Sequence, residues 1–483
     1  NFDNPHHTSR KTPPFSHLSA GARAPRTPVD VHFISRGVNH IPMKLEAEVL
    51  SRIKPTKQQD KKVATAVDAL TEKVMKEAVA RSVRIEPMLV GSVAKGTHMK
   101  DPDIDLFMLF PESTPLEVLK QKGLEIGRSV MAKGREHYAQ HPYVRGEFDG
   151  FEVDLVPAYK IRDTRAKMSA VDRTPFHTEF VKGNLGPEQA DEVRRLKRFM
   201  KVIECYGAEA KVQGFSGYLC ELLVIRFGSF REVMKAASSW KVGEVLELQG
   251  YLGGEFQEPL TFVDPVDPTR NVASAVAVET LLRFVHASRA YTSDGDIRFF
   301  FPNPQEVWDL QTLQAAAGDR LGNVISVTFP KLDLIDDVTY PQLRKSLSSV
   351  AALLTRHDFE VEKTTVHVDD ESHLLVELAS MSLPKERKHR GPPVNSENAG
   401  EFLAKWQTLG VSKPYVEDGR WFVMVHREHV RGDALVRTGL KGLTLGKDVR
   451  SAGRVEVQSG EELLEDRHLS ALTHHFDERM PWQ

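Results

Sequence analysis

The sequence predicts a multidomain α+β protein, and three observations support this prediction. Its 483 residues are too many for a single hydrophobic core, so we expect three or four domains. Between about residues 63 and 156, apolar residues recur first at helical spacing and then in short strand-like runs, as in a mixed sheet covered by helices. After residue 340 helices and strands alternate again, which is typical of further domains of mixed class.

The first domain is predicted to begin with a helix and to continue with short strands. The apolar residues at helical spacing, which predict an amphipathic helix packed on a sheet, are Val63, Val67, Leu70 and Val74. The run 88–90 predicts one strand, and alternation predicts two more over 103–109 and 151–156, the last ending at Pro157. Residues 127–137 are expected to form part of another helix.

A phosphate-sized loop follows the first strand. Gly91 allows the backbone to approach a ligand closely, and Ser92 offers a hydroxyl and an amide to a phosphate oxygen. Lys95 adds a positive charge. The loop therefore predicts a site for an anionic ligand.

Acidic residues follow the loop at strand spacing. In the strand over 103–109, Asp103 and Asp105 share one face while the intervening apolar residues share the other. Asp154 lies in a second alternating strand and completes a triad if the two strands are neighbours. Neighbouring carboxylates repel each other, and a divalent cation relieves that repulsion while it also binds phosphates. Three such residues can hold two Mg²⁺ ions for nucleotidyl transfer.

An Asp-x-Asp pair alone is common in sequences that bind no metal. The combination of Gly-Ser at a strand end, Asp-x-Asp about a dozen residues later and a third Asp in an apolar strand is much more specific. In this combination the segment resembles the polymerase-beta-like nucleotidyltransferases. The resemblance implies a metal-dependent enzyme whose catalytic head domain is a mixed sheet with helices.

Composition sets outer limits on function. The net charge of −2 does not indicate a nucleic-acid partner, so RNA contacts would have to come from local basic patches. Cys205 and Cys220 are the only cysteines, which excludes a disulfide framework and favours the cytoplasm. No apolar run is long enough for a membrane span. Residues 1–42 are rich in Pro, His, Ser and Arg and predict a disordered extension.

The remaining elements are predicted from periodicity. A basic run over 194–201 indicates a helix, and the small polar residues that open 214–222 indicate a turn and a helix start suited to a nucleotide. An amphipathic helix is expected over 343–354. The later segments are predicted as strands over 361–368 and 374–378, a basic loop over 385–390, a helix over 401–406, a turn at 418–419 and a strand over 421–425.

Five segments together are similar to the archaeal-type, class I CCA-adding enzymes, a family of tRNA nucleotidyltransferases. They are 171–177, 206–209, 214–222, 263–273 and 336–343. The resemblance covers nearly everything after residue 43 and fades in the last hundred residues. It implies a head at 43–185, a helical neck that binds nucleotide and substrate at 186–300, and an α/β body with a small α+β tail at 301–483, where tRNA binds.

The resemblance also implies roles for single residues. Asp103, Asp105 and Asp154 would be the catalytic metal ligands. The nucleotide, ATP or CTP, would be contacted by Ser92, Lys95, His177, Lys197 and Tyr206. Without the resemblance, His177 would more simply be a structural histidine. Arg270 is expected to select the incoming base, since its guanidinium can present a fork of donors.

Two positions depart from the family pattern. Lys95 stands where the family has Arg, which replaces a bidentate contact with a point charge, and Asp103 stands where Glu is commoner. The loop between Ser92 and the acidic pair is also one residue shorter. A shorter acid and a shorter loop can compensate for each other, so we expect activity.

The predicted function is the template-independent addition or repair of the 3′-terminal CCA of tRNA, with release of pyrophosphate. The resemblance also favours a homodimer. The acceptor arm is expected on the 194–201 helix face and the 385–390 loop, although a solvated helix face is an equally good explanation of the first. Two alternatives stay open: another template-independent polymerase, such as a poly(A) polymerase or an oligoadenylate-synthase-like enzyme, and a catalytically inactive RNA-binding relative.

Overall fold

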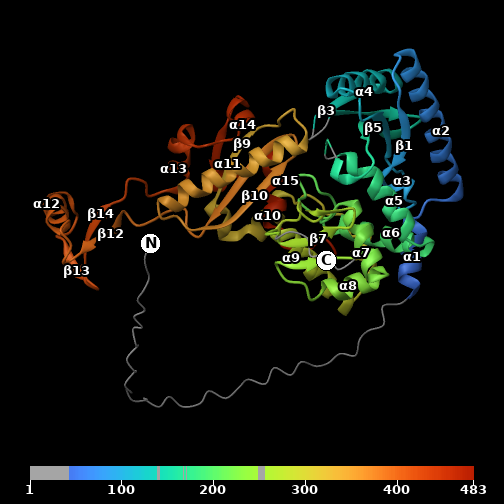
Figure 1. Ribbon diagram of the computed structural model, residues 1–483. Helices are drawn as coiled ribbons and strands as arrows, with labels where there is room; N and C mark the ends of the chain where they lie inside the picture. The colour runs from blue at the N-terminus through green and yellow to red at the C-terminus, as the bar shows by residue number, and fades with distance from the viewer. Residues whose placement is uncertain (1–42, 139–141, 167, 170, 249–255) are drawn as a thin grey trace, which may run out of the picture. The chain divides into compact units, whose positions relative to one another are not determined.

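A computed structural model describes residues 43–483, apart from 139–141, 167, 170 and 249–255 (Figure 1). The disordered extension expected at residues 1–42 lies outside this range. The described residues confirm a multidomain α+β fold, with four separate β-sheets and helices between them. None of the helices in this part of the chain is long and apolar enough to cross a membrane.

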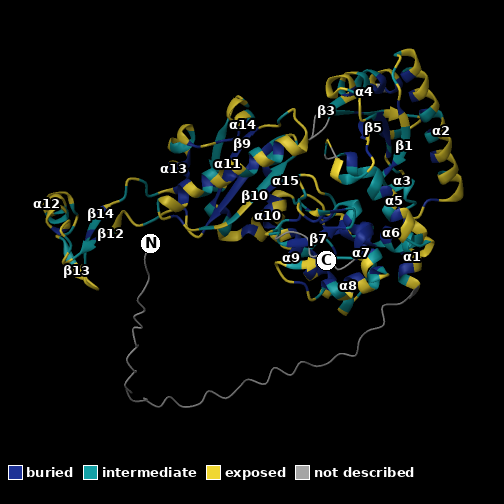
Figure 2. Ribbon diagram, in the orientation of Figure 1, coloured by how far each residue is buried: buried dark blue, intermediate teal, exposed yellow. Residues whose placement is uncertain are grey.

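The head is a five-stranded mixed sheet in the order β1-β2-β5-β4-β3, in which only β2 and β5 pair in parallel. Its elements are α2 (Lys57–Ala80), β1 (Glu86–Val90), α3 (Gly91–Ala94), β2 (Ile104–Pro111), α4 (Leu116–Val130), β3 (Ala132–Tyr138), β4 (Pro142–Phe148) and β5 (Phe151–Lys160). Helices α2 and α4 pack on one face, where Leu70 and Ile126 meet Ile104 and Leu155. Figure 2 shows that the outer side of α2 is exposed, as its predicted amphipathic pattern requires.

Two predictions for the head were wrong at element boundaries. The segment 127–137 is not one helix, because α4 ends at Val130 and the edge strand β3 follows. Strand β5 does not end at Pro157 but continues to Lys160. Pro157 pairs with Met108 of the parallel neighbour, and Gly123 of α4 lies so close that an added Cβ would be 2.5 Å from the Pro157 ring.

The neck has the largest aromatic core of the described residues. Its elements are α5 (Thr174–Asn184), α6 (Pro187–Val202), α7 (Gly217–Phe227), α8 (Phe230–Ala237), β6 (Glu244–Leu246), β7 (Leu260–Asp264), β8 (Asp267–Asn271) and α9 (Val278–Ser293). Phe199 of α6 contacts the rings of Phe230, Phe284 and Tyr291. Helix α1 (Met43–Ile53) precedes the head in sequence, yet Val49 and Ile53 belong to this core.

The body is a four-stranded sheet in the order β10-β11-β9-β15, covered by the long helix α11. Its elements are α10 (Leu310–Ala317), β9 (Val324–Pro330), α11 (Asp336–Arg356), β10 (Val361–Val368), β11 (Glu371–Leu378), α13 (Gly432–Gly439), α14 (Lys447–Ser451), β15 (Glu456–Ser459) and α15 (Leu469–Phe476). The helix over 343–354 and the strands over 361–368 and 374–378 are therefore confirmed, the helix within a longer element.

The tail is a three-stranded antiparallel sheet with one helix. It consists of β12 (Glu386–Pro393), α12 (Ala399–Leu409), β13 (Tyr415–Glu417) and β14 (Arg420–His426). The turn at 418–419 is confirmed by positive φ at both residues. The loop predicted over 385–390 was wrong, because Arg387 and its neighbours form strand β12, paired with β14. Short 3-10 helices elsewhere span Thr164–Ala166, Val171–Arg173, Ile297–Phe299, Gly318–Asn323, Leu440–Gly442, Gly460–Leu463 and Asp466–His468.

Candidate active site

Three aspartates meet on one face of the head sheet. Asp105 on β2 is the direct partner of Asp154 in the parallel register with β5, and Asp103 immediately precedes β2. Ile104 and Leu106 lie in the core on the opposite face, so the strand alternation turns the carboxylates away from it. The predicted alternation and the predicted neighbouring strand are both confirmed.

The carboxylates raise one another's affinity for protons. Burial, with the added negative charges of Asp154 and Asp103, raises the pKa of Asp105 to about 6. Burial also raises the pKa of Asp103, and the charges of Glu152 and Asp154 act in the same direction. Negative charge at this site is therefore only partly compensated by the protein, which is the setting that a divalent cation stabilises.

Gly91 closes the site from the side of β1. Its φ is +68°, a left-handed conformation that favours glycine, and Val90 before it pairs with Asp105. A Cβ at this position would lie 1.9 Å from Oδ2 of Asp105. The position predicted to admit a ligand thus also has to be a glycine because the Asp105 carboxylate lies against it. Ser92 is half-buried and follows directly, as the second residue of α3.

A side chain that sequence analysis did not identify, Arg145 of β4, holds the third aspartate. Its Nε donates to Oδ1 of Asp154 and its Nη2 to Oδ2, each at 2.7 Å. Among the described residues, no group of three His, Cys, Asp or Glu side chains is placed to hold a metal ion. The residue types nevertheless fit one, because carboxylate oxygens are the ligands that Mg²⁺ prefers and the negative charge at Asp105 is only partly compensated by Lys95 and Arg145.

Two predicted nucleotide contacts, Lys95 and Lys197, meet at one buried glutamate. Glu221 of α7 accepts from Nζ of Lys95 at 2.6 Å and from Nζ of Lys197 at 3.3 Å, and Thr97 also donates to it at 2.6 Å. Burial acts against the Glu221 charge, but the two lysines outweigh it and lower the pKa of Glu221. Burial lowers the pKa of Lys197, whose side chain is only 3% exposed. Lys197 therefore supports the loop from beneath, while Lys95 links it to the neck.

The basic helix face over 194–201 was predicted as an RNA-binding surface, with a solvated helix face as the alternative. The structure overturns this prediction for Arg194, which is buried, whereas Lys201 is exposed. Arg194 is buried and donates to the carbonyls of His98 and Gly96, at 2.7 and 2.5 Å. Arg198 donates to the carbonyl of Phe300 at 2.6 Å. These side chains connect α6 to the loop after α3 and to the end of the 3-10 helix Ile297–Phe299, because buried carbonyls need donors.

Tyr206 and Lys197 approach each other at the start of α7. A Cβ on Gly217 would lie 3.0 Å from the hydroxyl of Tyr206 and 3.7 Å from Nζ of Lys197. Burial raises the pKa of Tyr206, so its hydroxyl stays protonated and can donate. Ser216 caps the helix by accepting from the amide of Leu219 at 3.1 Å. The predicted turn and polar helix start are confirmed.

His177 and Arg270 share one buried carboxylate, Asp264 of β7. Its Oδ2 accepts from Nε2 of His177 at 3.0 Å and from Nη1 of Arg270 at 2.9 Å. Its Oδ1 accepts from the hydroxyl of Tyr218 at 3.2 Å and from the amide of Val266 at 3.1 Å. Burial acts against the Asp264 charge, but His177 and Arg270 outweigh it and lower the pKa of Asp264. Burial lowers the pKa of His177, which also stacks on Tyr218.

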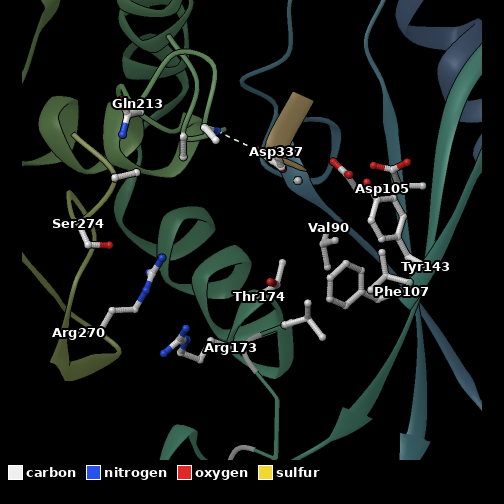
Figure 3. A pocket seen from close by; sticks show the side chains of 17 residues that line it. Val90, Asp105, Phe107, Tyr143, Arg173, Thr174, Gln213, Arg270, Ser274 and Asp337 are labelled. Carbon is white, nitrogen blue, oxygen red and sulfur yellow. Dashed lines mark hydrogen bonds between the residues drawn. The ribbon is translucent and has the colours of Figure 1, made fainter. Parts of the chain in front are cut away.

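A pocket of about 860 Å³ joins the head to the neck. Figure 3 shows Arg270 and Arg173 on one side of it and Asp105 with Tyr143 on the other. Asp337, at the start of α11, accepts from the amide of Ala210 at 2.8 Å across the rim. The full lining is Val90, Gly91, Asp105, Phe107, Tyr143, Asp154, Val156, Val171, Arg173, Thr174, Ala208, Ala210, Gln213, Arg270, Ser274, Ala275 and Asp337.

The pocket brings together only part of the predicted set. Asp105, Asp154 and Arg270 line it, and Gly91 forms its wall. The other predicted residues lie around it and are not part of its lining: Asp103, Ser92, Lys95, His177, Lys197 and Tyr206. Sequence analysis missed Arg145, Glu221 and Asp264 as supporting residues. The last two stand inside segments that carried the family resemblance, which was the only signal for them.

Three models of known protein families match successive parts of this chain. Residues 71–177 match the family model of the nucleotidyltransferase domain, residues 191–301 that of the second domain of tRNA nucleotidyltransferase, and residues 320–460 that of the C-terminal domain of CCA-adding enzyme. The solved structure of an RNA terminal U-transferase is 17% identical, with a TM-score of 0.42, and the alignment covers 55% of this chain and 98% of that one.

Whole-length relatives are more similar. The CCA-adding enzyme of Thermoplasma acidophilum is 40% identical over 403 residues, which are 83% of this chain and 91% of the relative. That of Methanosarcina acetivorans is 39% identical over 442 residues, 89% of this chain and 96% of the relative. With three domain models matched in order and identity sustained across nearly the whole of these archaeal proteins, the chain belongs to the family of CCA-adding enzymes.

Proposed function

We propose that this protein adds or repairs the 3′-terminal CCA of tRNA from CTP and ATP, by nucleotidyl transfer that releases pyrophosphate. The observation that carries the proposal is the pairing of Asp105 and Asp154 in register, across one pocket from Arg270. The pocket thus has carboxylates on one wall and a guanidinium on the other. A nucleotide that spans it would place its phosphates and its base against different walls.

The head supplies the groups for phosphoryl chemistry. Asp103, Asp105 and Asp154 would hold two Mg²⁺ ions, which when bound supply charge for the triphosphate and lower the pKa of the RNA 3′-hydroxyl. Gly91 lets backbone and ligand approach Asp105 closely, and Ser92 offers its hydroxyl to a phosphate oxygen. Lys95 keeps its ammonium beside the loop through Glu221 and can donate to the triphosphate from there.

The neck supplies the groups for sugar and base. Tyr206 keeps its phenolic proton and can donate to the ribose or a phosphate. Lys197 lies next to it and donates to the hydroxyl of Thr97. Burial lowers the pKa of His177 and favours its neutral form, although the bond to Asp264 acts in the opposite direction. We therefore assign His177 a positioning role and not that of a fixed positive charge. Arg270 gives one nitrogen to Asp264 and its side chain is 30% exposed, which leaves donors for a base edge.

Incorporation of labelled CTP and ATP into tRNA transcripts tests the function. Three transcripts are needed, ending before CCA, after its first C and after CC, with Mg²⁺ present and each nucleotide supplied alone and together. Ordered addition of C, C and A, and then a stop, is expected. Unlimited addition of A would instead assign a poly(A) polymerase activity, and absence of any incorporation would favour an inactive RNA-binding relative.

An exchange of Asp105 for Asn tests the carboxylates themselves. The variant keeps the shape of the side chain but lacks the charge that a cation needs, so transfer should be abolished while the fold persists. The same transcripts serve as the assay, and full activity of Asp105→Asn would contradict the proposal. The homodimer implied by the family resemblance stays a prediction, which the molar mass in solution would test.

A further inference from the structure

Arg145 forms the most regular ion pair of the candidate active site. It lies on β4 directly opposite Asp154 in the antiparallel register with β5, so the backbone itself sets the two side chains against each other. Its fork meets both oxygens of Asp154 at 2.7 Å. The Arg145 side chain is 41% exposed whereas the Asp154 side chain is 13% exposed. The contact is therefore well aligned but open to solvent on the arginine side.

Both oxygens that would bind a cation already accept from this guanidinium. A carboxylate has about four lone-pair sites, so a metal ion and Arg145 can share Asp154 only in part. A positive charge next to a divalent ion also opposes its binding, and this repulsion remains even where the oxygens are shared. The arrangement lowers the affinity of the protein alone for a cation. The negative charges of a bound triphosphate would restore this affinity for a cation. Mg²⁺ is suited to such a site, because it is usually bound through one or two carboxylates together with substrate phosphates.

We propose that Arg145 is a positioning residue that competes with divalent cations for Asp154, so that metal binds tightly only together with the nucleotide. The proposal rests on the metal-binding role given above to the three aspartates. The sequence of β4 does not by itself predict this role, because the partner of Arg145 is Asp154 on the neighbouring strand β5. The guanidinium fixes the Asp154 carboxylate and sets the order in which ligands assemble.

Binding of Mn²⁺ to the full chain, followed by electron paramagnetic resonance without RNA or nucleotide, tests the proposal. Arg145→Gln removes the charge and should lower the Kd for Mn²⁺ about tenfold, because a unit charge no longer repels the ion across a part-exposed site. Arg145→Lys keeps the charge and should bind Mn²⁺ about as weakly as the unaltered chain. With saturating nucleotide, the difference between Arg145→Gln and the unaltered chain should shrink.

The chain offers a matched control in the body. Arg320 forms a comparable fork on Glu377, at 2.7 and 3.0 Å, and its side chain is also 41% exposed. Arg320→Gln should leave Mn²⁺ binding unchanged, and thermal unfolding of each variant checks that it folds. The proposal would be overturned if Arg145→Gln bound Mn²⁺ no more tightly than the unaltered chain. It would also be overturned if Arg145→Lys bound Mn²⁺ as tightly as Arg145→Gln.

Asp154→Asn separates this inference from the proposed function. Its Mn²⁺ binding should be weak whether Arg145 is present or replaced by Gln, because the shared carboxylate is gone. If Asp154→Asn bound Mn²⁺ like the unaltered chain, the metal-binding role of Asp154 would itself fail. Because no arm uses RNA, loss of CCA addition for any other reason does not alter the result.

Discussion

Asp264 is the residue whose exchange most directly tests base selection. It is completely buried, and its two oxygens accept four hydrogen bonds, two at each oxygen. Asp264→Asn keeps the shape but turns one oxygen into an NH₂ donor. In one orientation that donor faces His177 and Arg270, and in the other it faces Tyr218 and the amide of Val266. Either orientation therefore loses the negative charge and at least one hydrogen bond, because the guanidinium of Arg270 and the amide of Val266 can only donate.

The expected loss of nucleotide selectivity in Asp264→Asn is worked out from the hydrogen bond between Asp264 and Arg270, which is charge-assisted and 2.9 Å long. A hydrogen bond between charged groups contributes about 1.5–3 kcal/mol. If that energy holds the guanidinium in its selecting position, its loss should lower the preference for the correct nucleotide about 10- to 100-fold, since 1.36 kcal/mol corresponds to a factor of about ten. The effect should fall on selectivity more than on the chemical step, because the carboxylates of the head are untouched.

The assay is kcat/KM for CTP and for ATP on transcripts ending before CCA and after CC. Asp433→Asn is the control, because Asp433 is buried in the body and also accepts from two arginines, Arg431 at 3.0 Å and Arg437 at 3.2 Å. It should lower stability without changing the ratio of the two constants. A ratio that survives in Asp264→Asn would refute the reasoning, whatever happens to the overall rate.

Three further predictions concern stability. Gly96→Ala should lose about 1–2 kcal/mol of stability, because its φ is +68° and an added Cβ meets nothing within 4 Å. Gly91→Ala has the same φ but should lose more, and most of its transfer rate as well, because its Cβ would lie 1.9 Å from Oδ2 of Asp105. Equal rates in the two variants would contradict this. Glu221→Gln leaves two buried lysines without their anion and should lower the free energy of unfolding by about 3–5 kcal/mol, so an unchanged urea midpoint would count against it. Burial lowers the pKa of His373 and of His475 to about 4 from 6.5. Below pH 6.5 the unfolded chain therefore binds protons that the folded chain does not, and the free energy of unfolding should fall by about 2 kcal/mol for each histidine between pH 7.5 and pH 5. Urea titrations across this range measure the loss, and a flat pH profile would refute it.

The sequence predicted the catalytic face because that face is a local property. Alternation alone puts Asp105 opposite the apolar residues of its own strand, and nothing distant has to be known. The supporting residues are different. Glu221 reaches Lys95 across 126 positions, and Asp264 reaches His177 across 87. Such partners depend on how domains pack, and no periodicity in the chain encodes them.

Two of the mistaken elements, β3 and β12, share a physical cause. Strands β3 and β12 are rich in charged residues, so they lack the apolar alternation by which a strand is recognised. Both are edge strands, and charges on an edge strand discourage pairing with other molecules. In the tail, Lys388 pairs with Glu417 and lies over the ring of Phe422. The same charges that suggested an RNA-binding loop are therefore part of a folded sheet.

The placement of charge also explains why composition did not indicate a nucleotide site. Three cations next to the pocket or its loop each have a carboxylate partner: Lys95 with Glu221, Arg270 with Asp264 and Arg145 with Asp154. Each pair adds nothing to the net charge of −2, yet each holds a donor in a fixed place. A preorganised donor loses little entropy when a phosphate or a base arrives, so its worth lies in position and not in surplus charge. If the proposed function holds, the buried acids should be as necessary to nucleotide binding as the cations that they hold in place.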